Sequence, residues 1–201
     1  MRPWTAMNRA LMLLAAVALV AVLVIGLTQA GGGSGDGASG GEAFSLAGAR
    51  EQLAGAPAPL AALHAQSNEI LEGGRDAFDE RLRELRGHPV VINKWASWCG
   101  PCRAELPILQ RISTERGREV AFVGVNARDK RPAAERFAAR YPVPYPSYED
   151  PSERIARAID APSNFPVTLF VDARGRTVFT HQGGYRTAAD LEADIDEHLG
   201  A

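Results

Sequence analysis

The longest apolar run lies near the start of the chain, where no charged residue occurs over positions 10–27. At about 18 residues, this run is near the lower limit for a membrane-spanning helix and longer than the usual core of a signal peptide. Arg2 and Arg9 flank its start and are the only basic residues among the first 49. The positive-inside rule then puts the N-terminus in the cytoplasm and the rest of the chain outside the membrane. We interpret residues 1–30 as a signal-anchor, or transmembrane, segment.

The residues after the apolar run have the composition of a tether. Small side chains around Ala30 form a weak cleavage signal, so secretion after cleavage there is the alternative to an uncleaved anchor. Residues 31–42 are rich in Gly and Ser, which is typical of a flexible linker. The Ala-rich residues that follow include a short predicted helix at 46–53. We assign 31–59 to a linker and 60–201 to a folded domain.

Within the domain, short continuous apolar runs alternate with segments in which apolar residues recur at helical spacing. The predicted strands are 68–71, the run that begins at Val90, 120–125, 167–171 and 177–180, and the predicted helices are 76–85, 103–116, 132–140, 152–159 and 187–199. Strands that alternate with helices, followed by a hairpin and a last helix, predict an α/β fold in which helices flank a mixed sheet.

Net charge and cysteine content exclude several classes of function. The formal net charge is only −2, and nothing in the sequence suggests the clustered basic face that nucleic-acid binding needs, so a nucleic-acid partner is not expected. The two cysteines, Cys99 and Cys102, are three positions apart. A disulfide scaffold has more cysteines spread along the chain, and a structural zinc site needs four ligands. The pair follows a predicted buried strand and opens a predicted helix, which is the context of a redox C-x-x-C motif.

The motif Trp98-Cys99-Gly100-Pro101-Cys102 suits thiol–disulfide exchange. Cys99 is expected at the N-terminal end of a helix, where unpaired N–H groups and the helix dipole favour a thiolate. Cys102 follows about one turn later and can attack the mixed disulfide that Cys99 forms with a substrate. Gly100 and Pro101 suit a tight turn into the helix, and Trp98 puts an aromatic ring beside the pair.

Four further residues are candidates for the site. Glu105 shares a helix face with Cys102 and is expected to relay protons or tune the thiols, with a solvated helix glutamate as the alternative. Asn93 falls in the buried strand, where its amide needs a polar partner. A cis bond between Phe165 and Pro166 would leave the backbone of Phe165 free to pair with an extended substrate, whereas the alternative is an ordinary loop proline.

Two segments carry a resemblance to a known family. Residues 93–107, NKWASWCGPCRAELP, resemble the active-site segment of the TlpA/ResA-like branch of the thioredoxin family. Residues 165–172, FPVTLFVD, are similar to that family's cis-proline strand. The resemblance covers residues 60–201 and implies a thioredoxin fold. The resemblance also implies the roles of the site residues. Cys99 is the nucleophile and Cys102 the resolving cysteine. Glu105 matches the family's active-site glutamate, and Pro166 its cis proline.

The resemblance also implies a function and partners. Family members are anchored or exported, and many reduce disulfides of exported proteins or of apocytochrome c, with electrons from a membrane thiol reductase of the CcdA/DsbD type. Asn93 stands where cytoplasmic thioredoxins carry a buried Asp, which favours this branch. Lys94 departs from the usual Phe, and the helix predicted at 76–85 departs from the branch's usual hairpin. No cofactor beyond the redox disulfide and no metal are expected.

Two other functions compete with a reductase. The first is an oxidase or isomerase of exported proteins, although Gly100-Pro101 matches the dipeptide of reducing thioredoxins. The second is a copper-carrying assembly protein of the Sco type. Those proteins use C-x-x-x-C with a distant His, whereas the spacing here is one residue shorter and the distant candidate is His181.

Overall fold

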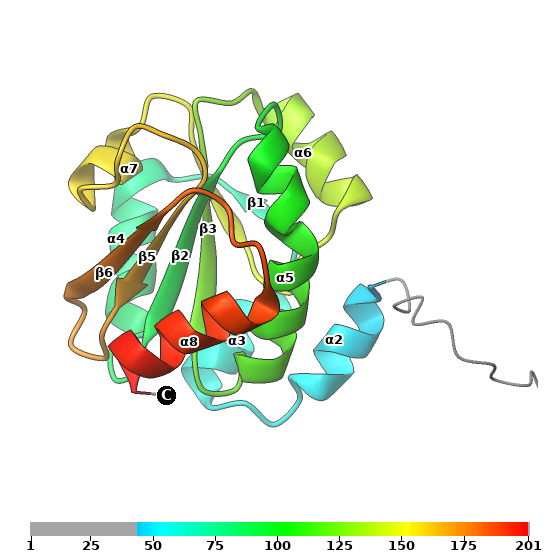
Figure 1. The fold of residues 1–201 in the computed structure, drawn as a ribbon, viewed down its shortest axis with the longest axis vertical. Helices are drawn as coiled ribbons and strands as arrows, with labels where there is room; N and C mark the ends of the chain where they lie inside the picture. The colour runs from blue at the N-terminus through cyan, green and yellow to red at the C-terminus, as the bar shows by residue number, and fades with distance from the viewer. Residues whose placement is uncertain (1–43, 201) are drawn as a thin grey trace, which may run out of the picture. The chain divides into compact units, whose positions relative to one another are not determined.

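A mixed sheet of six strands runs through the centre of residues 44–200, the part of the chain that the computed structural model describes (Figure 1). The strands are β1 (Ile70–Leu71), β2 (Val90–Trp95), β3 (Ala121–Ala127), β4 (Ser147–Asp150), β5 (Val167–Val171) and β6 (Thr177–Gln182). Their spatial order is β1-β4-β3-β2-β5-β6. Each of the pairs β1–β4, β4–β3 and β3–β2 is parallel. The strand β5 is antiparallel to both β2 and β6. The α/β class with a mixed sheet is thereby confirmed.

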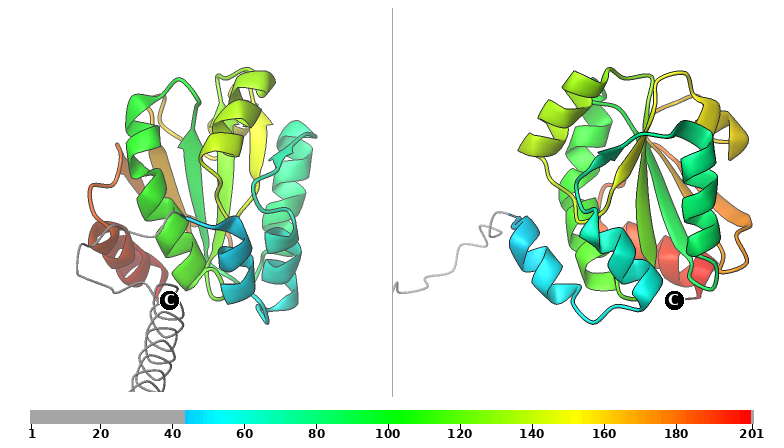
Figure 2. Two further views of the ribbon diagram at one scale, coloured as in Figure 1. Left: turned by 90° about the vertical axis from the view of Figure 1, so that its right-hand side faces the viewer. Right: turned by 180° about the vertical axis from the view of Figure 1, so that it is seen from behind.

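Helices cover both faces of the sheet (Figure 2). They are α2 (Leu46–Gln52), α3 (Ala58–Ala65), α4 (Gly74–Glu84), α5 (Gly100–Arg116), α6 (Arg131–Arg140), α7 (Arg154–Ala158) and α8 (Ala188–Leu199). Apolar side chains of α5, α6 and α8 form one core cluster with the sheet, and those of α3, α4 and α7 contribute to a second. This is the layered arrangement that buries both faces of a largely parallel sheet.

The central strand β2 positions the site. All six of its residues are buried between β3 and β5, as its continuous apolar start predicts. Successive side chains of a strand point to opposite faces, so Val91, Asn93 and Trp95 face one layer and Ile92 and Lys94 face the other. Val91 and Trp95 belong to the cluster that contains α5, which places Asn93 on the same side as that helix.

Two elements differ from the sequence-based expectation. The helix α3 was not predicted, because Ala58–Ala65 is so rich in Ala that its apolar positions show little periodicity. The strand β4 was missed because Ser-Tyr-Glu-Asp is short and polar, although Tyr148 is buried. The predicted helix at 46–53 is confirmed as α2, and Leu53 at its end is buried. The packed structure therefore begins before the boundary expected at residue 60.

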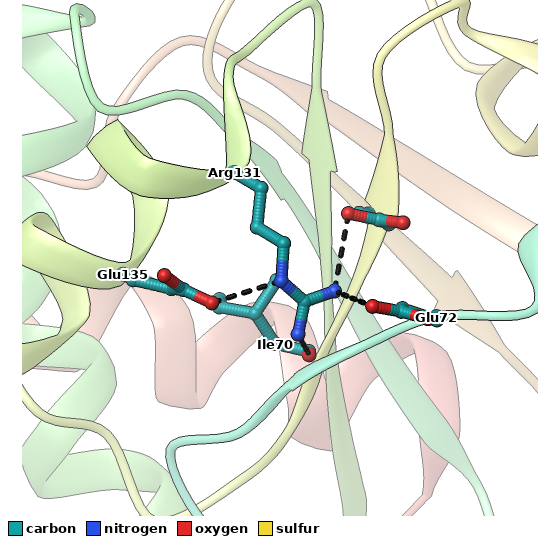
Figure 3. Close-up of polar contacts among 5 residues, drawn as sticks. Ile70, Glu72, Arg131 and Glu135 are labelled. Carbon is teal, nitrogen blue, oxygen red and sulfur yellow. Dashed lines mark hydrogen bonds and ion pairs between the residues drawn. The ribbon is translucent and has the colours of Figure 1, made fainter.

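Arg131, in the first turn of α6, contacts the edge of the sheet (Figure 3). Arg131 Nη2 donates to the carbonyl oxygen of Ile70 in β1 at 3.1 Å. Its other nitrogens pair with Glu135 at 2.8 Å, Glu72 at 2.7 Å and Glu149 at 3.4 Å. Three carboxylates therefore compensate the positive charge of the guanidinium. These contacts hold the first turn of α6 against β1 and β4.

The expected membrane segment at 1–30 and the Gly/Ser-rich part of the expected linker, up to residue 43, lie outside the described residues. Among residues 44–200, none of the helices combines the length and the apolar character that a membrane crossing requires.

Candidate active site

Cys99 and Cys102 form a disulfide where β2 leads into α5, with an S–S distance of 2.03 Å. Cys99 is the N-cap residue of α5, and its Sγ accepts a hydrogen bond from the backbone N–H of Cys102 at 3.1 Å. Pro101 lies in the first turn, where its missing N–H costs nothing. The predicted position of the motif at a helix N-terminus is confirmed, so a thiolate on Cys99 would be stabilised by this N–H and by the helix dipole.

The loop before the disulfide is held by a residue that the sequence did not single out. Asp129 accepts hydrogen bonds from the backbone N–H and the hydroxyl of Ser97, at 2.5 and 2.9 Å, and from Asn126 at 3.0 Å. Burial alone would raise the pKa of Asp129, but these hydrogen bonds, with one from the Lys130 N–H, lower it. The ionised carboxylate therefore anchors the loop in one conformation.

Glu105 is fully buried in α5. Its Oε1 accepts a hydrogen bond from Asn93 Nδ2 at 3.0 Å, and its Oε2 accepts one from the backbone N–H of Tyr185 at 3.2 Å. Burial raises the pKa of Glu105 to about 7, and the two hydrogen bonds only partly oppose this rise. The alternative of a solvated helix glutamate is therefore wrong. Asn93 has the polar partner that its buried position requires.

Pro166 and Glu105 border the same glycine, Gly184. The peptide bond between Phe165 and Pro166 is cis, as the family resemblance implies. A methyl group at Gly184 would lie 3.4 Å from the carbonyl oxygen of Pro101, 3.6 Å from Glu105 Oε2 and 3.7 Å from Pro166 Cγ. These three atoms surround one glycine, so the buried carboxylate, the cis proline and the turn between the two cysteines meet at one place.

Two residues of the β6–α8 loop thus belong to the site although the sequence did not indicate them. Gly184 leaves the space between Glu105 and Pro166 open, and Tyr185 supplies the N–H for Glu105. The Gly183-Gly184 pair was a signal of close backbone approach. The residue that this loop contacts, Glu105, lies more than 70 residues earlier in the chain, so a local sequence pattern could not identify it.

Aromatic rings and a buried cation lie next to Phe165. Trp98 is 55% exposed, donates from Nε1 to the carbonyl oxygen of Arg128 at 3.0 Å, and contacts the Phe165 ring edge-on at 5.0 Å between centroids. Lys94 Nζ lies 4.2 Å from the centroid of the same ring. The side chain of Lys94 is fully buried, and burial lowers its pKa. It pairs with Glu153 at 3.6 Å and donates to the carbonyl oxygen of Pro162.

His181, the distant histidine of the copper alternative, has other partners. Its Nδ1 lies 3.4 Å from a carboxylate oxygen of Asp194, and its ring stacks on Tyr185. Within residues 44–200, no group of three His, Cys, Asp or Glu side chains is arranged to hold a metal ion.

A C-x-x-C disulfide at the start of a helix, a buried carboxylate and a cis proline on a mixed sheet define a thioredoxin-fold protein with a redox motif. The chain belongs to the Redoxin family, whose model matches residues 54–196.

Individual relatives agree with this assignment. The chain is 31% identical over 104 residues to the thiol-disulfide oxidoreductase ResA of Halalkalibacterium halodurans, covering 51% of this chain and 58% of ResA. It is 41% identical over 93 residues to the thiol:disulfide interchange protein DsbE of Allochromatium vinosum, covering 45% and 49%. Each match therefore spans less than two thirds of the relative. The crystal structure of a DsbE-type protein from Chlorobium tepidum superposes with a TM-score of 0.53 at 29% identity, covering 59% of this chain and 85% of that one.

Proposed function

We propose that this chain is an extracytoplasmic thiol–disulfide oxidoreductase of the ResA/DsbE type that reduces disulfides of exported proteins. The observation that carries the proposal is the Cys99–Cys102 disulfide at the N-terminus of α5. The names of the relatives, which are thiol-disulfide oxidoreductases and interchange proteins, support the same reaction. The two cysteines are the redox centre, and no other cofactor enters the reaction.

In the reduced protein, the Cys99 thiolate attacks one sulfur of the substrate disulfide, and the other sulfur leaves as a thiolate that takes up a proton. Cys102 then attacks Cys99 Sγ, which releases the second substrate thiolate and leaves the Cys99–Cys102 disulfide. The substrate gains two electrons and two protons. Glu105 is three residues after Cys102 on the same helix and has a pKa near 7, so its carboxylate can accept the proton that Cys102 loses.

Each turnover oxidises the protein, so a donor must return two electrons. A membrane thiol reductase of the CcdA/DsbD type suits a domain outside the cytoplasm that is tethered by residues 1–30. The apolar run and the two arginines before it support this orientation, either as an uncleaved anchor or with cleavage near Ala30. Apocytochrome c is one candidate substrate among exported proteins. Labelling of the reduced cysteines in intact cells by a membrane-impermeant thiol reagent tests the orientation, and protection from the reagent contradicts it.

Insulin reduction with dithiothreitol as donor tests the activity, with the Cys99→Ser/Cys102→Ser protein as the control. We expect precipitation of the insulin B chain only with the intact motif, and no difference between the two proteins would overturn the proposal. The reduction potential then decides the direction. A value near that of reducing thioredoxin, about −270 mV, supports a reductase, whereas one near about −120 mV, as in DsbA, favours the oxidase alternative.

A further inference from the structure

A surface pocket of about 300 Å³ lies between the start of α5 and the length of α6. Three of its lining side chains are arginines, namely Arg103, Arg136 and Arg140. Ser97 and Tyr141 also line it. We call this site the arginine pocket. It adjoins the redox motif, because Ser97 and Arg103 are the residues that flank the segment from Trp98 to Cys102. Figure 1 shows α5 and α6 side by side at this end of the sheet.

Within the part of the chain that the structure describes, no ion pair neutralises the positive charge of the arginine pocket. No carboxylate lines the pocket, and within residues 44–200 none of its three arginines forms an ion pair. The guanidinium of Arg140 lies 5.5 Å from the Tyr141 ring centroid, and that of Arg103 lies 6.0 Å from it. Both guanidinium groups thus border the same half-buried ring and add positive charge to one pocket, which attracts an anion.

The acidic residues nearest to these arginines in sequence are already engaged, since Glu105, which follows Arg103 closely, accepts from Asn93 and Tyr185. Glu135 of α6 accepts from Arg131, and Asp129 accepts from Ser97, Asn126 and Lys130. Arg131 on the same helix shows the contrast, because three carboxylates surround it (Figure 3). The arginine pocket therefore offers the same kind of donor, and none of its arginines is paired with a carboxylate among residues 44–200.

We propose that the arginine pocket binds acidic side chains of the polypeptide whose disulfide the protein exchanges. The inference rests on the proposed function and names a class of substrate, namely a protein with Asp or Glu close to the reacting cysteine. Guanidinium groups match carboxylates in geometry and bind them in bidentate fashion. Because the pocket adjoins the motif, a carboxylate seated there belongs to the chain segment whose sulfur reaches Cys99. The contact raises the rate of encounter and holds the segment in register.

Two synthetic peptides with one internal disulfide test the proposal. In one, the residues that flank the cysteines are Glu, and in the other they are Gln. The full reduced protein is compared with Arg136→Glu/Arg140→Glu and with a control of equal charge change, Arg118→Glu/Arg174→Glu. Arg118 and Arg174 are exposed and lie at the other end of the sheet from the disulfide.

We expect the wild type and the control to prefer the Glu peptide, with a kcat/KM ratio of about five at low salt, as two partly exposed charge pairs provide. The ratio should fall as salt is raised from about 20 to 300 mM, since the Debye length shrinks. In Arg136→Glu/Arg140→Glu the ratio should drop to one or below. Equal rates for both peptides in the wild type, or an equal loss of preference in the control, would overturn the pocket while leaving the oxidoreductase intact. Reduction of neither peptide would instead overturn the proposed function.

Discussion

The amide nitrogen of Asn93 lies 3.0 Å from Glu105 Oε1, and this hydrogen bond joins β2 to α5 inside the protein. The strand leads into the loop of Cys99, and the helix begins at that residue. Asn93 also lies 3.4 Å from Thr168 Oγ1 in β5, the strand that follows Pro166. The three elements that supply the site are thus linked through one buried polar group. A change in the charge of Glu105 therefore alters the hydrogen bonds that link the elements carrying the two cysteines and the cis proline.

Glu105→Gln should change the dependence of stability on pH. The folded pKa of about 7 is above the ordinary value of 4.5, so the folded protein binds this proton more tightly than the unfolded chain does. The stabilisation is complete below about pH 4.5 and is lost as the pH rises to about 7. Between pH 5 and 8 the wild type should lose about 2 kcal/mol more of its unfolding free energy than the variant does. Urea denaturation of both oxidised proteins at the two pH values measures the difference.

The same variant should affect catalysis near neutral pH. Gln cannot accept a proton, so the rate of exchange should lose the rise that accompanies ionisation of Glu105 near pH 7. Glu115→Gln, on the exposed part of α5, is the matched control and should leave both profiles unchanged. Identical pH profiles for Glu105→Gln and the wild type would remove Glu105 from the proton pathway.

Asn93→Ala should raise the pKa of Glu105 further. The Asn93 amide donates to the carboxylate, and loss of a donor to the charged form disfavours that form. The inflection in the rate of exchange should therefore move above pH 7. Thr168→Val removes only the longer contact to Asn93, so this variant should shift the inflection less. The two profiles can be compared by stopped-flow measurement of tryptophan fluorescence, and a downward shift for Asn93→Ala contradicts the assignment.

The two cysteines should differ when each is replaced by serine. Cys102→Ser leaves the nucleophile Cys99 at the helix N-terminus but removes the group that resolves the mixed disulfide. This variant should accumulate a covalent complex with a substrate protein, visible as a reducible band on a non-reducing gel. Cys99→Ser should give no such complex. A complex trapped by Cys99→Ser alone would reverse the two roles.

Much of the domain could be predicted because its signals are local. Val90-Val91-Ile92 and 167–171 are continuous apolar runs and prove to be buried strands, and the C-x-x-C motif lies where a strand meets a helix. The burial of Glu105 was beyond local pattern. A glutamate within a helix is usually solvated, and its burial here depends on Asn93 and Tyr185, which come from distant parts of the chain. The anchoring role of Asp129 was missed for the same reason, since its partner Ser97 precedes it by 32 residues.

Lys94, which departs from the family's usual Phe, gives the last prediction. Its ammonium is fully buried and is compensated by Glu153, the carbonyl oxygen of Pro162 and the Phe165 ring. Glu153→Gln leaves this buried cation without its ion-pair partner and should cost about 2 kcal/mol or more of unfolding free energy. Lys94→Met removes the cation itself and keeps a chain of similar length. The Glu153 side chain is 22% exposed, so its carboxylate can then turn to water and this variant should cost less.

A double-mutant cycle separates the charge from the packing. In Lys94→Met/Glu153→Gln neither charge remains, so the loss should be smaller than the sum of the two single losses by about 1 kcal/mol or more. Arg75→Met and Asp79→Asn, an exposed pair on α4 at 3.1 Å, provide the matched cycle, and their coupling should be about 0.5 kcal/mol or less. Urea denaturation of the wild type and the six variants at pH 7 gives both values. If Lys94→Met proved as costly as Glu153→Gln and the losses simply added, the lysine would stabilise the domain through its aliphatic chain, and its buried charge would contribute nothing.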